Sequence, residues 1–254
     1  MRKRLFALGA SLFVTVSVAF AATGGEAARR PSLAQAVDRT IHVASLRYAL
    51  GVQITRDGRS RAMHVRGQAD AHTISVAVAL SPIRLPDGTK LPGPTGAALL
   101  YGPFLYVRAP SNVLVFGKIR WLRTPLAQLS PASDDLRTLH ALVPEPLLRV
   151  LLRGSAKAGR PGAAVVRGTL AYDDAVVRTS LLQLTGGLEF RALRFEAEVG
   201  RDGLVHRLRF TGRTADGRTT LSLVAHLFAF GKPLHVAPPA PGTFMDQELE
   251  LLAT

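Results

Sequence analysis

The residues whose chemistry suits a catalytic or metal site are few and widely separated. No two of the seven histidines are four residues apart, which is the spacing that places two metal ligands on one face of a helix. The histidines are His42, His64, His72, His140, His206, His226 and His235. There is no Gly-x-Ser-x-Gly motif and no glycine-rich phosphate loop ahead of a helix. The absence of cysteine excludes a thiol nucleophile, a cysteine-ligated metal and a disulfide. We therefore expect no catalysis, no metal and no cofactor.

Two sets of residues leave an enzymatic alternative open. His206 and His226 fall on different predicted strands and could be neighbours in space, so a hydrolase built around one of them is an alternative. Two pairs of aspartates occur at residues 134–135 and 173–174. The first pair is predicted near a helix N-terminus, which favours negative charge, and the second pair is predicted to form a turn.

The chain is strongly basic, with 32 Lys and Arg against 18 Asp and Glu, a net charge of +14. Most of the arginines alternate with apolar residues, as in LVHRLRF at residues 204–210, which favours a solvated face of a sheet. Attraction to anionic lipid head groups or to an envelope polymer is the alternative. We expect no nucleic acid partner, since no binding motif is present.

The N-terminus has the pattern of an export signal. A basic segment at residues 2–4 precedes an uncharged apolar run that ends in Ala19-Phe20-Ala21, which predicts a signal peptide over residues 1–21 and a linker over 22–31. An uncleaved N-terminal helix that anchors the protein is the alternative. We expect an exported protein of the cell envelope, the periplasmic space or the exterior.

The elements that follow predict an α+β fold with one large antiparallel sheet. Ser32 and Gln35 form a capping box, which begins a helix of about ten residues. Alternating apolar residues then predict strands, bounded in four places by Asp-Gly pairs at residues 57, 87, 202 and 216. The predicted strands cover residues 46–54, 63–65, 74–80, 99–101, 104–107, 113–123, 165–170, 176–184, 193–199, 204–210 and 221–227.

The remaining segments are predicted as helices and loops. Residues 134–153 have helical spacing, with Pro144 and Pro146 as the break and a short helix resuming at Leu147. Residues 81–94 and 157–162 are predicted loops, and the tail from Pro238 is predicted to be loose. We expect one domain over residues 32–246 and a flexible tail over 247–254.

Two helical segments over so wide a sheet suggest an unfilled apolar cavity on its concave face, and ordinary packing of a filled core is the alternative. Small strand residues could leave this space: Ala49, Gly51, Ala77, Ala79, Ala197 and Ala225. Strand parity, which a register error of one residue would reverse, gives the candidate ligand-binding residues. These are Tyr48, Leu50, Val52, Ile74, Val76, Val78, Phe195, Leu208, Phe210, Leu223 and Leu227.

Five segments, in this order, resemble a known family of envelope lipoproteins. The segments are FLYVR at residues 104–108, KIRWL at 118–122, PLLRVL at 146–151, GRDGLVHRL at 200–208, and FAFGKPLHV at 228–236 with the prolines at 238–239. They are similar to the LppX/LprA/LprF/LprG-type lipoproteins of the LolA-like half-barrel superfamily. The resemblance extends over about residues 31–246.

This resemblance implies a curved antiparallel half-barrel whose helices cover the concave face. It also implies non-catalytic binding and transport, or chaperoning, of acylated lipids, glycolipids or lipoproteins. The chain departs from the family in having no lipobox cysteine. An envelope sensor or adaptor that binds a protein partner through the same groove is the alternative function.

Overall fold

The computed structural model describes nine stretches of the chain. These are residues 31–80, 83–84, 90–91, 95–108, 119–130, 133–156, 164–172, 174–185 and 187–246. The predicted signal peptide, nearly all of the linker, the tail after residue 246, most of loop 81–94 and loop 157–162 lie outside the described residues. The Asp87-Gly88 turn and residues 113–118 of one predicted strand also lie outside them.

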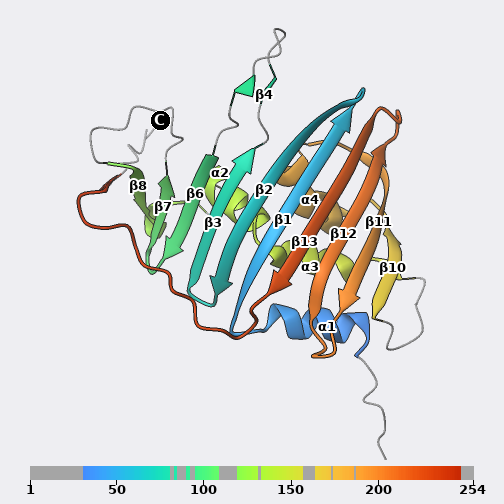
Figure 1. Cartoon of the computed structure of the whole chain (residues 1–254), viewed down its shortest axis with the longest axis horizontal. Coiled ribbons are helices and arrows are strands. Elements are labelled where there is room, and N and C mark those ends of the chain that lie inside the picture. The colour runs from blue at the N-terminus through green and yellow to red at the C-terminus, as the bar shows by residue number, and fades with distance from the viewer. Residues whose placement is uncertain are drawn as a thin grey trace, which may run out of the picture.

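A twelve-stranded open sheet forms the body of the described structure (Figure 1). The strands lie in the order β14-β8-β7-β6-β3-β2-β1-β13-β12-β11-β10-β9, and each neighbouring pair is antiparallel except β14–β8. The predicted fold class, a single large and mostly antiparallel sheet with helices, is confirmed. The strands are β1 (Ser45–Arg56), β2 (Arg59–Asp70), β3 (Thr73–Leu80), β6 (Thr95–Tyr101), β7 (Phe104–Arg108), β8 (Trp121–Pro125), β9 (Ser155–Ala156), β10 (Val165–Leu170), β11 (Phe190–Val199), β12 (Val205–Thr214), β13 (Thr219–Phe228) and β14 (Phe244–Asp246).

Tight turns set the register of the long strands. Gly58, Gly203 and Gly217 all have a positive φ of 71° to 77°, and each follows an aspartate. Glycine adopts this backbone without steric cost, and the three predicted Asp-Gly turns are confirmed between β1 and β2, β11 and β12, and β12 and β13. A separate two-stranded ladder, β4 (Ile83–Arg84) with β5 (Lys90–Leu91), interrupts the predicted loop 81–94.

All four α-helices lie on one face of the sheet, which we call the inner face; the opposite one is the outer face. Figure 1 shows α2, α3 and α4 behind the sheet and α1 across the ends of β11 and β12. The helix α1 begins with the predicted capping box, in which the Ser32 hydroxyl accepts from the Gln35 N–H and the Gln35 side chain accepts from the Ser32 N–H. The helices are α1 (Leu33–Ile41), α2 (Asp134–Ala141), α3 (Pro144–Leu151) and α4 (Ala175–Thr185), and a 3₁₀ turn η1 spans Leu126–Gln128.

The predicted strand at residues 176–184 is wrong, because this segment is helix α4. The Asp174 side chain accepts hydrogen bonds from the N–H groups of Val176 and Val177, which is N-terminal capping rather than the predicted turn. The break within 134–153 was also placed too late. Helix α3 begins at Pro144, since the first turn of a helix tolerates proline.

The tail after Pro238 is not loose throughout, which corrects the prediction. Strand β14 pairs in parallel with β8 at the edge of the sheet. On the outer face, the Arg123 guanidinium lies over the rings of Phe104 and Phe244, 4.7 and 4.4 Å from their centroids. It also donates two hydrogen bonds to the Asp246 carboxylate, so one arginine ties the tail to the edge strands.

Candidate functional site

The eleven predicted ligand-binding residues share the inner face. Tyr48 is paired with Leu227, Val52 with Leu223, and Leu223 in turn with Phe210. Residues that are directly opposite on neighbouring strands project to the same face, and the pairing continues across β2 and β3 to the remaining members. The parity argument therefore placed all eleven on one face correctly. Their contact with a ligand stays a prediction.

The inner face has two halves that differ in burial. The covered half consists of β1 and β10–β13, and the open half consists of β2, β3, β6 and β7. In the covered half, the inner side chains Leu208, Phe210 and Leu223 are fully buried. The helix residues packed in the same core are buried as well, among them Leu147, Leu148, Leu151, Val177 and Leu181. The covered half is thus filled by side chains of the protein itself.

In the open half, much of the apolar inner surface is only half-buried. Val65, Val76 and Leu105 are buried, whereas Leu80 is 43% exposed. The residues around them are partly buried hydrophobics: Met63, Ile74, Val78, Ala98, Leu100 and Val107. Met63, Leu100 and Val107 were not among the predicted site residues. All three lie on predicted strands, but the sequence did not show which strands are neighbours in the sheet, and that pairing is what places these residues on the inner face.

Tyr48 lies at the border between the two halves. Its ring extends from β1 over Gly67 of β2, where an added Cβ would overlap with the Tyr48 Cζ and hydroxyl. Tyr48 is 2% exposed, and within the described part of the chain its hydroxyl has no hydrogen-bond partner. Burial raises the pKa of this hydroxyl above its ordinary value, so it is a neutral O–H donor.

Most of the small strand residues do not leave space on the inner face, which corrects that expectation. Ala49 is paired with His226 and Arg66, and Gly51 with His64 and Val224, all on the outer face. Ala77 and Ala79 lie on the same outer face, since Val76 and Val78 are inner. Ala197 and Ala225 do lie on the inner face, and both are buried in the core of the covered half.

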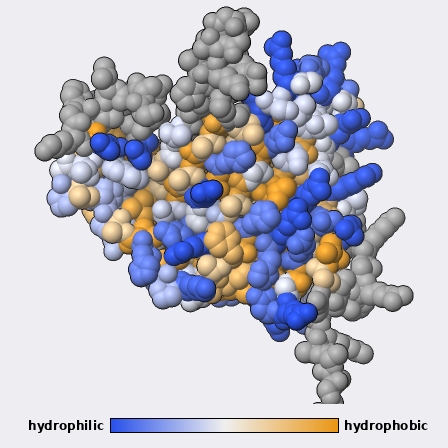
Figure 2. All heavy atoms as spheres, in the orientation of Figure 1, coloured by the Kyte–Doolittle hydropathy of each residue, from blue (hydrophilic) through white to orange (hydrophobic). Residues whose placement is uncertain are grey.

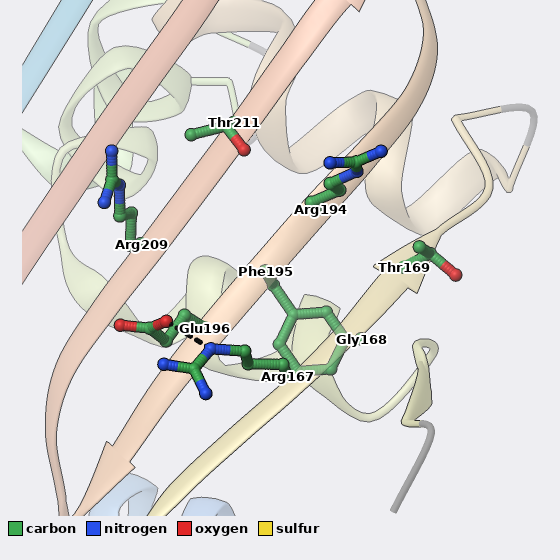
Figure 3. A pocket seen from close by; sticks show the side chains of 8 residues that line it. All are labelled: Arg167, Gly168, Thr169, Arg194, Phe195, Glu196, Arg209 and Thr211. Atoms are coloured by element: carbon green, nitrogen blue, oxygen red, sulfur yellow. Dashed lines mark hydrogen bonds and ion pairs between the residues drawn. The ribbon is translucent and has the colours of Figure 1, made fainter.

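Three depressions stand out at the surface of the described residues, and Phe195 is the one predicted ligand-binding residue that borders any of them. The depression over β10–β12 has a volume of about 530 Å³ and lies on the outer face. Figure 3 shows its arginine and threonine side chains on the near side of the sheet, with the helices behind.

The histidine pair does not assemble a catalytic site. His226 is paired with Arg207, and adjacent strand residues project to opposite faces, so His206 and His226 lie on different faces. The His206 ring lies 2.9 Å from the Asp202 carboxylate and packs edge-on against Phe230. Burial opposes ionisation of Asp202, but its hydrogen bonds with His206 and the Leu204 N–H outweigh this, and its pKa lies below the ordinary value.

The described residues contain neither a metal-binding cluster nor a membrane-spanning helix. No group of three or more histidine, aspartate and glutamate side chains is close enough together there to hold a metal ion. None of the described helices combines the length and the apolar character that a membrane crossing requires.

Comparison with known proteins gives likeness of shape alone. No protein-family model matches the chain, and no curated protein matches it. A DUF1329 family protein from Desulfovibrio piger aligns with 81% of this chain and 92% of its own, at 7% identity and a TM-score of 0.28. A domain from Vibrio parahaemolyticus, provisionally described as an outer membrane lipoprotein-sorting protein domain, aligns with 80% of this chain and 94% of its own, at 9% identity and a TM-score of 0.28.

A hot-dog-fold protein of unknown function from Alicyclobacillus acidocaldarius is also similar. It aligns with 80% of this chain and 85% of its own, at 14% identity and a TM-score of 0.19. At such low TM-scores, none of these likenesses carries an argument about family or function.

Proposed function

We propose that this protein binds an acylated lipid, glycolipid or lipoprotein and carries or chaperones it in the cell envelope, without a catalytic step. The observation that carries this proposal is the half-buried apolar surface of the open half, beside a filled core. Ile74, Val78 and Leu100 lie there on neighbouring strands, and Leu80 is 43% exposed beside them. The N-terminal segment, with the pattern of an export signal, supports this location.

The energetic reason is the cost of an acyl chain in water. Each buried methylene gains about 0.8 kcal/mol, so a chain of about sixteen carbons gains on the order of 10 kcal/mol before the cost of binding is subtracted. Such a chain needs a continuous apolar surface. The open half provides one that runs across β2, β3, β6 and β7.

Tyr48 supplies a polar group at the edge of this surface. An acyl ester or amide has a carbonyl oxygen, and the neutral Tyr48 hydroxyl is an O–H donor without a partner among the described residues. The hydroxyl is buried, so the ligand would reach it only as the side chains that cover it move aside. A hydrogen bond to the ligand would then satisfy a group whose burial otherwise costs about 1–3 kcal/mol. The ligand would then lie with its carbonyl at the border and its chain over the open half.

Native mass spectrometry of the purified full chain, together with uptake of a fluorescent fatty-acyl probe, tests the proposal. We expect co-purified lipid and saturable uptake. Val78→Asp adds a charge on the inner face of β3 and should abolish uptake, because an unpaired carboxylate is strongly disfavoured beside an acyl chain. Ala79→Asp makes the same addition on the outer face of the same strand and should leave uptake unchanged.

Three results would overturn the proposal. The first is a protein that contains no lipid and takes up no probe. The second is an equal loss of uptake in both variants when circular dichroism shows both to be folded. The third is capture of one stoichiometric protein partner with no lipid, which would support the adaptor alternative instead.

A further inference from the structure

The outer face carries a separate arrangement of charge that acyl binding does not use. No helix of the described residues lies on it, and Figure 2 shows hydrophilic side chains gathered over the half formed by β10–β13. Strand pairing places its residues in rows across the sheet. One row runs Arg66, Ala49, His226, Arg207, Glu198, and the next runs His64, Gly51, Val224, Arg209, Glu196, Arg167.

Arginine exceeds carboxylate on this surface. On the outer side of β1, β2 and β10–β13, seven arginines lie among the rows with three carboxylates, two glutamates and Asp70. The glutamates are already paired, Glu196 with Arg167 at 2.6 Å and Glu198 with Arg207 at 2.8 Å. The described residues give no ion pair or side-chain hydrogen bond to the other five, which are Arg47, Arg66, Arg194, Arg209 and Arg213.

Two of these free arginines border the outer depression. Arg194 is paired with Thr211, and Arg209 lies two residues from Thr211 on the same strand, so the two arginines are diagonal neighbours about 7–8 Å apart in backbone position. Figure 3 shows the Thr211 hydroxyl turned toward Arg194, with Arg209 on the other side of Thr211. Glu196, which forms an ion pair with Arg167, also lines the depression and lies directly opposite Arg209. The two guanidinium groups and the hydroxyl are donors of the kind that phosphate groups accept.

The same surface has one further feature that fits a lipid head-group layer. Phe228, opposite Arg47, is 46% exposed on the same face. An apolar side chain among arginines can enter the interface while the arginines contact phosphates.

We propose that the outer face docks on an anionic membrane surface, with Arg194 and Arg209 binding the phosphate group of a lipid. The arginines extend over β1, β2 and β10–β12, as contact with a broad charged plane requires. Docking does not depend on acyl binding at the inner face. Val78→Asp should therefore abolish uptake of the acyl probe and leave vesicle binding intact, which separates the two proposals.

The test is co-sedimentation of the full chain with vesicles of phosphatidylcholine alone or mixed with phosphatidylglycerol. We expect binding to the anionic vesicles that weakens as salt is raised. Arg194→Gln/Arg209→Gln should weaken it roughly 30-fold, the loss expected for two arginines at an anionic surface. The control Arg137→Gln/Arg153→Gln removes the same charge from exposed residues in and after the helices α2 and α3, and should weaken binding far less. All variants keep residues 1–21, so the basic segment at residues 2–4 cannot cause a difference in vesicle binding between them.

Several outcomes would overturn the docking proposal. Equal binding to neutral and anionic vesicles would show that charge does not direct it. An equal loss in both double variants would show that net charge acts without this face. Binding to a soluble polyanion such as nucleic acid, with none to anionic vesicles, would assign the surface to another partner. A matching urea midpoint for both double variants confirms that they are folded.

Discussion

The covered and open halves of the sheet both present apolar side chains on the inner face, but these side chains differ in how deeply they are buried. Leu208 and Leu100 both project to the inner face from antiparallel strands, yet the first is fully buried and the second is half-buried. The difference comes from the helices: α1 lies against β11 and β12 and contacts α3, and α3 in turn contacts α4, whereas Figure 1 shows α2 behind β2 and β3. An alternating strand pattern thus defines an apolar face, and the placement of the helices decides whether that face becomes core or remains accessible to a ligand.

Leucine truncation in the two halves should give the largest difference. Leu208→Ala leaves a cavity in a filled core and should lower the free energy of unfolding by about 3–5 kcal/mol. Leu100→Ala removes a half-buried side chain and should lower it by about 1–2 kcal/mol. Urea unfolding of both variants measures this. Equal losses would show that the two halves are packed alike.

A methyl group at the border should cost less than the Leu208 truncation. Gly67→Ala places a Cβ against the Tyr48 ring and should destabilise the protein by about 1–3 kcal/mol. Gly96→Ala, on the inner face of β6, meets nothing within 4 Å of the new Cβ and should be close to neutral. In the double variant Tyr48→Leu/Gly67→Ala the cost at residue 67 should disappear. Strict additivity of the two changes would contradict the contact.

Removal of the Tyr48 hydroxyl should have a smaller effect, of opposite sign. Tyr48→Phe deletes a buried donor that has no partner among the described residues, and should raise the free energy of unfolding by about 1 kcal/mol. The acyl probe should bind more weakly to the same variant. Tyr172→Phe is the matched control, because its hydroxyl donates to the Leu188 carbonyl at 2.7 Å and its loss should be destabilising. The proposed role of Tyr48 requires that Tyr48→Phe raises the free energy of unfolding and that Tyr172→Phe lowers it.

Acid should act most weakly, at the sheet edge beside the open half. Hydrogen bonds from Arg123 hold the pKa of Asp246 below its ordinary value of 3.8. The ionised carboxylate therefore contributes its full stabilisation at pH values above 3.8. This contribution is lost as the pH falls through the lower pKa of Asp246 in the folded protein. A plot of Tm against pH should be flatter for Asp246→Asn in the acid range than for the parent protein. Arg123→Gln removes the same hydrogen bonds and should give the same flattening.

The difference between the halves also explains which predictions failed. Residues 176–184, with the sequence VVRTSLLQL, combine two β-branched valines with three leucines, and so short a segment fits a strand or a helix. The signal that distinguishes them was Asp174, whose side chain caps α4. Without α4, the helix cover was underestimated, and a filled core was expected to be a cavity.

Local chemistry by itself determined much of this protein. The Asp-Gly turns, the capping box at Ser32 and the alternation of β1, β12 and β13 are local features, so the sequence was enough to place these strands and to assign all eleven predicted residues to one face. Burial is a property of contacts between residues far apart in the chain. Only the tertiary structure therefore decided that Leu208 is core and Leu100 half-buried, that Tyr48 lies over Gly67, and that Arg194 and Arg209 lie together on the face without helices.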